Sequence, residues 1–151
     1  MPDFLSDHRD TLDGALAAID ERTYWSAYPE HPKAYGEEAP AAGQATFDTL
    51  LGKPFALDQA STGSLTVAES SPFGLELGIT YPATDVDTVV GDAVTAMAGW
   101  GKASPDERAG VCLEILARLA ADPFTMAHAV MHTTGQSFLM AFQAGGPHAL
   151  D

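Results

Sequence analysis

Two histidines have a spacing that could support metal chemistry. His128 and His132 are four residues apart, which places both imidazoles on one face of a helix at the spacing of a zinc pair. The zinc-protease pattern needs a glutamate directly after the first histidine, and Ala129 occupies that position. The sequence offers no evident third ligand, so we expect these residues to be surface or core histidines.

Cys112 is the only cysteine in the chain. A nucleophilic thiolate needs a helix N-terminus, a cation or a base beside it. Cys112 lies in the middle of a predicted helix between Val111 and Leu113, so we expect a small, buried apolar side chain. A single cysteine cannot form an internal disulfide, which fits a reducing compartment and predicts a cytoplasmic protein.

Three further patterns have structural explanations. The Gly-Trp-Gly run at 99–101 begins a dinucleotide motif, but Ser104 stands where the third glycine belongs and a helix precedes it in place of a strand. We expect a helix end there. Asp85 and Asp87 fit the positive end of a helix dipole. With 21 acidic residues in the chain, adjacent pairs such as the glutamates at 37–38 are expected by chance.

An aromatic group could form a surface for a partner. It consists of Tyr24, Trp25, Tyr28 and Tyr35, in a stretch with prolines that favour extended or turn structure. Two interpretations stay open. The group lines a pocket or interface, or it packs as a satellite cluster over the helices.

The elements that must position these residues are mostly helical. Apolar residues at helical spacing predict helices over residues 6–22 and 39–51, and four more after residue 84. Thr84 is the expected N-cap of the first of these four. Its apolar stripe comprises Val86, Val89, Val90, Ala93, Met97 and Trp100.

The next three helices begin or end with clear signals. Ser104 to Glu107 form a capping box with proline at the first helical position, and that helix extends to about Ala121. Asp122 and Pro123 begin another helix, which Gly135 ends. A last amphipathic stretch covers residues 138–144.

The segment before residue 84 has the alternation of β-strands. Leu65 and Val67 form one such run, and residues 75–81 form a second with apolar side chains at odd positions. Residues 70–74 between them contain serine, proline and glycine, which favour a turn. We therefore predict an antiparallel hairpin. The predicted fold class is an α-rich α+β chain: N-terminal helices, one hairpin, then three or four packed amphipathic helices.

The charge balance restricts the partners. The formal net charge of −14 repels phosphate backbones and anionic lipid, so we expect neither nucleic acid nor a membrane as a partner. No apolar run approaches the roughly 20 residues that span a bilayer.

Longer sequence words carry a family resemblance. Residues 71–151 resemble the start of the aldehyde dehydrogenase superfamily, in which a helix near a tryptophan is followed by two more helices, the second ending in Thr-Gly-Gln. The words ERTYWSAYPE at 21–30, RAGVCLEIL at 108–116, AHAVMHTTGQ at 127–136 and MAFQAGGPHA at 140–149 resemble its phenylacetic acid degradation branch.

The resemblance implies an amino-terminal portion of an NAD- or NADP-dependent enzyme that oxidises an aldehyde to an acid. In the branch, the substrate is the ring-cleaved semialdehyde of a CoA thioester. A cysteine attacks the aldehyde, hydride leaves to the nicotinamide, and a glutamate activates water. These residues lie beyond Asp151 in the family, so we expect no catalytic, cofactor-binding or metal-binding residue in this chain.

The expected organisation follows from the resemblance. Residues 1–62 form a family-specific extension, and residues 63–151 form the hairpin and helices. Residues 148–151 carry no cap, which is typical of a sequence cut short. The expected partner is the rest of the aldehyde dehydrogenase domain, with a homo-oligomer possible in principle. Two alternatives stay open: a non-catalytic helical interaction module, and a complete small enzyme with an unfamiliar site.

Overall fold

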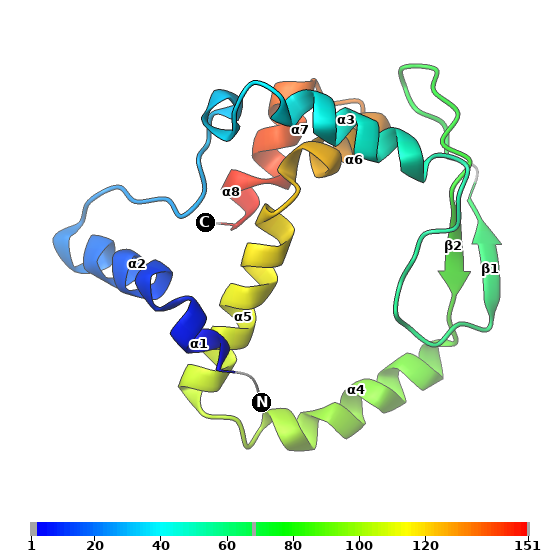
Figure 1. Cartoon of the computed structure of the whole chain (residues 1–151). Helices are drawn as coiled ribbons and strands as arrows, with labels where there is room; N and C mark the ends of the chain where they lie inside the picture. The colour runs from blue at the N-terminus through cyan, green and yellow to red at the C-terminus, as the bar shows by residue number, and fades with distance from the viewer. Residues whose placement is uncertain (1–2, 68, 151) are drawn as a thin grey trace.

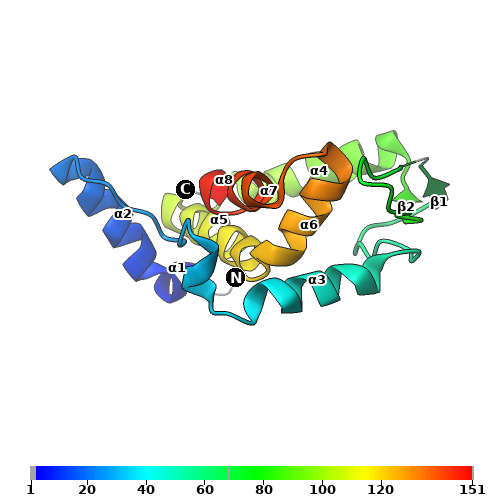
Figure 2. The same cartoon turned by 90° about the horizontal axis from the view of Figure 1, so that it is seen from above.

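The computed structural model describes residues 3–67 and 69–150 as a helix-rich chain with one two-stranded sheet (Figure 1). Helices α3, α6 and α7 gather at one end, and α4 lies at the opposite side of the molecule (Figures 1 and 2). No described helix is long and apolar enough to cross a membrane. In chain order the elements are α1 (Phe4–Asp7), α2 (Arg9–Glu21), the 3₁₀ helix η1 (Pro32–Tyr35), α3 (Ala39–Leu50), β1 (Gly63–Thr66), β2 (Thr80–Ala83), α4 (Val86–Trp100), α5 (Pro105–Ala120), α6 (Pro123–Thr134), α7 (Phe138–Gly145) and α8 (Pro147–Leu150).

The predicted caps of α5 and α6 are confirmed. Ser104 Oγ accepts the Glu107 amide at 3.1 Å, and the Glu107 carboxylate accepts the Ser104 amide at 2.7 Å, which completes the capping box. Asp122 Oδ1 accepts the Thr125 amide at 3.2 Å at the start of α6. Gly135 ends α6 in the left-handed region with φ of 78°, a conformation that suits glycine.

The first predicted helix is divided in two. His8 leaves helical geometry between α1 and α2, with φ of −117° and ψ of 17°. The His8 Nε2 atom lies 2.7 Å from Glu114 Oε2 on α5. Leu5 of α1 is buried beside Gly110, which also belongs to α5. The two contacts fasten α1 to α5, whereas α2 projects away from it (Figure 1).

The hairpin is antiparallel as predicted, but its second strand is shorter and begins at Thr80, where residues 75–81 were predicted. β1 pairs with β2 so that Leu65 stands opposite Tyr81. Residues 75–79 lie outside this ladder, because Gly78 has φ of 60° and the Leu77 carbonyl accepts the Gly52 amide at 2.8 Å. The loop after α3 therefore takes the Leu77 carbonyl, whereas the Leu75 carbonyl still accepts the Ser71 amide at 3.3 Å across the predicted turn.

The core lies where α6 and α7 pack together and meet η1. Phe124 and Phe142 are buried with their ring centroids 5.0 Å apart, and Ala127 fills the space beside them. The Tyr35 ring makes edge contacts with both phenylalanines at 5.5 and 5.7 Å. Aromatic edge contacts of this kind add to the stabilisation from apolar burial.

A glycine lets α3 approach α6 closely. A Cβ at Gly43 would lie 2.2 Å from Phe124 Cβ, so only glycine fits at this crossing. The same packing buries Phe47 of α3 against α6. Helix α3 falls within the predicted extension of residues 1–62, whose boundary stays a prediction.

Candidate functional site

Cys112 is exposed, which contradicts the prediction of a buried side chain. The face of α5 around Gly110 packs on α1, and Cys112 lies on another face together with the exposed Ile115 and Leu119. The residue is two turns into α5, away from the helix N-terminus that lowers a thiol pKa. Its position gives it no feature of an activated nucleophile.

His128 and His132 are core residues. They are 7% and 8% exposed, and the Phe47 ring stacks on both of them. His132 Nδ1 lies 2.8 Å from Ser71 Oγ. Within residues 3–67 and 69–150, no group of three histidine, cysteine or acidic side chains could hold a metal ion.

The acidic pair before α4 and the glycine run after it are helix ends. Asp85, not Thr84, is the N-cap, and its carboxylate accepts the Thr88 amide at 2.9 Å and the Thr88 hydroxyl at 2.8 Å. These bonds, the hydroxyl first, lower the pKa of Asp85. Asp87 lies in the first turn and Gly101 is the C-cap, as the sequence indicates.

The aromatic group does not form one cluster. Tyr35 belongs to the helical core, whereas the Trp25 indole lies against Gly14 of α2. The Tyr24 ring is exposed, and its hydroxyl donates to the Glu30 carboxylate. The group therefore forms no single satellite cluster, because Tyr35 packs in the main core and Trp25 packs on α2.

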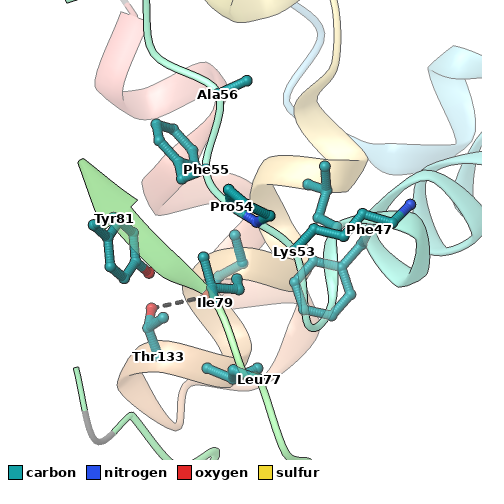
Figure 3. Close-up of a pocket in the computed structure, with 11 residues that line it drawn as sticks. Phe47, Lys53, Pro54, Phe55, Ala56, Leu77, Ile79, Tyr81 and Thr133 are labelled. Carbon is teal, nitrogen blue, oxygen red and sulfur yellow. Dashed lines mark hydrogen bonds between the residues drawn. The ribbon is translucent and has the colours of Figure 1, made fainter. Parts of the chain in front are cut away.

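An apolar pocket of about 270 Å³ lies between α3, α6, β2 and the loop after α3 (Figure 3). Two of its polar groups have partners in the chain: the Tyr81 hydroxyl donates to Glu69 at 2.7 Å, and the Thr133 hydroxyl donates to the Ala129 carbonyl at 2.8 Å. The alternation at 77–81 predicts the apolar side chains of one wall of this pocket. No sequence signal predicts the loop that forms the other wall. The lining residues are Phe47, Leu50, Lys53, Pro54, Phe55, Ala56, Leu77, Ile79, Tyr81, Ala129 and Thr133.

The largest departure from an ordinary globular surface is α4. Every residue of this helix is exposed, including the predicted apolar stripe, which is called the α4 stripe below. Val86 is 72% exposed and Met97 is 66% exposed. An isolated helix of this length is marginal in water, and most helical stability in proteins comes from packing of the apolar face. The stripe is therefore a surface suited to a partner.

Comparison with known proteins identifies the fold. No protein-family model and no curated protein matches the chain. The structure superposes on the crystal structure of an NAD-dependent aldehyde dehydrogenase from Burkholderia multivorans with a TM-score of 0.88 and 50% sequence identity. The match covers 97% of this chain and 27% of that one. The fold is thus a helix-rich portion of an aldehyde dehydrogenase fold, and the identity supports the resemblance to that superfamily.

Proposed function

We propose that this chain is a scaffold segment of an NAD-dependent aldehyde dehydrogenase and that catalysis needs the remainder of that enzyme. The observation that carries the proposal is the 50% identity over 97% of the chain together with the match to only 27% of the Burkholderia enzyme. The exposed α4 stripe supports it, because an apolar helix face in water fits a segment whose packing partner is absent.

The proposed reaction converts an aldehyde, NAD⁺ and water into an acid, NADH and a proton. A thiolate adds to the carbonyl carbon, hydride passes to the nicotinamide, and water releases the acid from the thioester. The proposal assigns these steps to residues outside this chain and a structural role to this segment. Within the family, we propose the phenylacetic acid degradation branch, with a ring-cleaved CoA-thioester semialdehyde as substrate. Its support is the sequence words at 21–30 and 127–136.

The α4 stripe is the proposed contact with the remainder of the enzyme. Burial of each valine or methionine contributes roughly 1.5–3 kcal/mol of transfer free energy. Val86, Val90 and Met97 are each more than half exposed, so this free energy is available for association. The opposite face of α4 carries Thr88 and Thr95, which are exposed and suit solvent.

Complementation tests the proposal. The chain is mixed with the Burkholderia enzyme shortened by the part that this chain matches, and NADH formation is followed with a panel of aldehydes and CoA-thioester semialdehydes. We expect activity from the mixture and none from either piece. No gain in activity, together with no binding by calorimetry, would contradict the proposal.

A matched pair of variants locates the contact. Met97→Asp places a carboxylate in the α4 stripe, and Thr95→Asp places one on the opposite face of the same helix half. We expect Met97→Asp to weaken association at least about tenfold, since the lost burial exceeds 1.4 kcal/mol. Thr95→Asp should leave it nearly unchanged. Equal effects of both variants would exclude the stripe as the contact.

A non-catalytic interaction module is the second candidate, because the same exposed stripe could bind an unrelated protein. Size-exclusion chromatography with light scattering tests one form of this alternative, in which the stripe binds a second copy of this chain. If the chain forms a homo-oligomer and Met97→Asp dissociates it into monomers, the stripe binds a second copy. Turnover of an aldehyde with NAD⁺ by the isolated chain would instead support a complete small enzyme.

A further inference from the structure

Three aromatic rings from different segments line the apolar pocket between α3, α6 and β2. Phe47 belongs to α3, Phe55 to the loop after α3, and Tyr81 to β2. Figure 3 shows Phe55 and Tyr81 on one side of the pocket and Phe47 on the other. The Phe55 and Tyr81 ring centroids are 5.9 Å apart, and their planes are tilted by 38°. Aromatic faces and edges attract further rings, so this lining favours an aromatic ligand.

The size and fixed walls of the pocket restrict that ligand to one ring. The Gly52 amide donates to the Leu77 carbonyl and the Phe55 amide donates to the Thr80 carbonyl, both at 2.8 Å. These bonds fasten the loop along residues 77–80, and ligand pockets are commonly preformed in this way. A cavity of about 150 Å³ holds benzene, so a volume of about 270 Å³ has room for one ring with a short substituent.

Two hydroxyl oxygens in the lining can accept a hydrogen bond from the ligand. The Tyr81 hydroxyl donates to the Glu69 carboxylate at 2.7 Å, and the Thr133 hydroxyl donates to the Ala129 carbonyl at 2.8 Å. The bond to Glu69 raises the pKa of Tyr81, so its hydroxyl remains protonated at neutral pH. Each hydroxyl has one proton and two lone pairs. Because both protons are used within the chain, both oxygens offer lone pairs to a ligand that donates.

Charged ligands of either sign gain no direct partner in the pocket. Among the described residues that line it, Lys53 carries the one charge, so Glu69 lies outside the lining. The Lys53 ammonium points away from Phe55 and Tyr81 (Figure 3). A carboxylate or ammonium group would lose its hydration among apolar side chains without an ion pair to compensate. We therefore expect the ligand to be uncharged.

We propose that this pocket is a binding site for a small uncharged aromatic molecule with one hydrogen-bond donor, such as a phenol. The ligand ring packs among Phe47, Phe55 and Tyr81, and the ligand hydroxyl donates to Tyr81 Oη or Thr133 Oγ1. This binding does not depend on the proposed dehydrogenase function. Related molecules bind poorly, because an isosteric hydrocarbon lacks the donor and a benzoate carries a charge.

Titration of the full chain with three ring compounds of similar size tests the site. The probes are p-cresol, which has the donor, p-xylene, which lacks it, and 4-methylbenzoate, which is an anion. Amide shifts in ¹H–¹⁵N NMR spectra follow binding. We expect p-cresol to give saturable shifts for the amides of Gly52, Phe55 and Leu77 and none for those of α2. It should bind about fivefold more tightly than p-xylene, the order of one net hydrogen bond, and at least about tenfold more tightly than 4-methylbenzoate.

Two results of the titration would overturn the proposal. One is the absence of saturable shifts at these amides up to about 10 mM p-cresol. The other is binding of p-xylene or 4-methylbenzoate as tight as that of p-cresol. Loss of p-cresol binding when the chain associates with the shortened Burkholderia enzyme would show that a protein segment occupies the pocket instead, and would also overturn it.

A matched pair of variants locates the site. Ala129→Phe fills the pocket with a ring, whereas Ala45→Phe adds the same ring at an exposed position of α3 outside the pocket. We expect Ala129→Phe to abolish p-cresol binding and Ala45→Phe to retain it. Equal binding by both variants would overturn the site.

If Ala129→Phe does not fold, the double variant Tyr81→Phe and Thr133→Val decides. It removes both acceptor oxygens and nearly preserves side-chain volume. We expect it to bind p-cresol and p-xylene equally. A retained preference for p-cresol would overturn the proposal.

Discussion

The crossing of α3 over α6 allows one prediction with its sign and size worked from the structure. The change is Gly43→Ala. The added Cβ would lie 2.2 Å from Phe124 Cβ and 2.9 Å from the Phe124 carbonyl carbon. Favourable carbon contacts lie at about 3.5–4.0 Å, so the helices must separate by about 1.3 Å or more. One of the obstructing atoms is backbone, so a side-chain rotation cannot relieve the contact.

Two effects of opposite sign decide the free energy of unfolding. Alanine in a helix interior is worth about 1 kcal/mol more than glycine. Overpacking a close-packed contact costs about 1–3 kcal/mol, and more where backbone must move. Separation of the helices also weakens the stacking of Phe47 on His132, which now sits at 5.2 Å. We therefore expect a net loss of about 1–2 kcal/mol.

Urea denaturation followed by far-UV circular dichroism measures this loss, with Gly91→Ala as the matched control. A Cβ at Gly91 of α4 meets nothing within 4 Å. That variant should show slightly more helix signal and an unfolding midpoint no lower than that of the wild type. A Gly43→Ala chain as stable as the Gly91→Ala chain would refute the close approach of α3 and α6.

Three further predictions concern caps, core and pH. Ser104→Ala should cost about 1 kcal/mol in urea unfolding, while Ser137→Ala should cost almost nothing because Ser137 makes no cap bond; equal losses would contradict the cap assignment. Phe142→Ala should cost about 3–5 kcal/mol, and a loss below about 1 kcal/mol in the same assay would contradict its 0% exposure. The Ser104 amide lowers the pKa of Glu107 from its usual 4.5, so its contribution is present above that pH and is lost on acidification. Glu107→Gln should therefore flatten the acid limb of stability against pH, and an unchanged limb would count against this bond.

Local signals in the sequence predict most helix ends. The capping box at Ser104 and the left-handed glycine at Gly135 are each encoded within a few residues, because they satisfy the backbone groups of one helix. Distant contacts decide what the sequence pattern missed. His8 interrupts the first helix beside Glu114, and the Leu77 carbonyl bonds to the Gly52 amide in the loop after α3.

Burial was the least predictable property. An apolar stripe predicts which face of a helix packs, but not whether its partner lies in the same chain. The α4 stripe lies on a helix as predicted, but all of its residues are exposed. The face of α5 that holds Cys112 was also expected to be buried and is also exposed. The sequence also does not predict the loop wall of the apolar pocket, because the residues around Phe55 have no helical or strand periodicity.

The central claim is that the α4 stripe packs on the remainder of an aldehyde dehydrogenase. Hydrogen exchange of residues 86–100, measured in the chain alone and in the mixture with the shortened Burkholderia enzyme, tests it most directly. The account predicts fast exchange alone and strong protection in the mixture, with Met97→Asp abolishing the protection. Slow exchange in the isolated chain, or no added protection in the mixture, would contradict it.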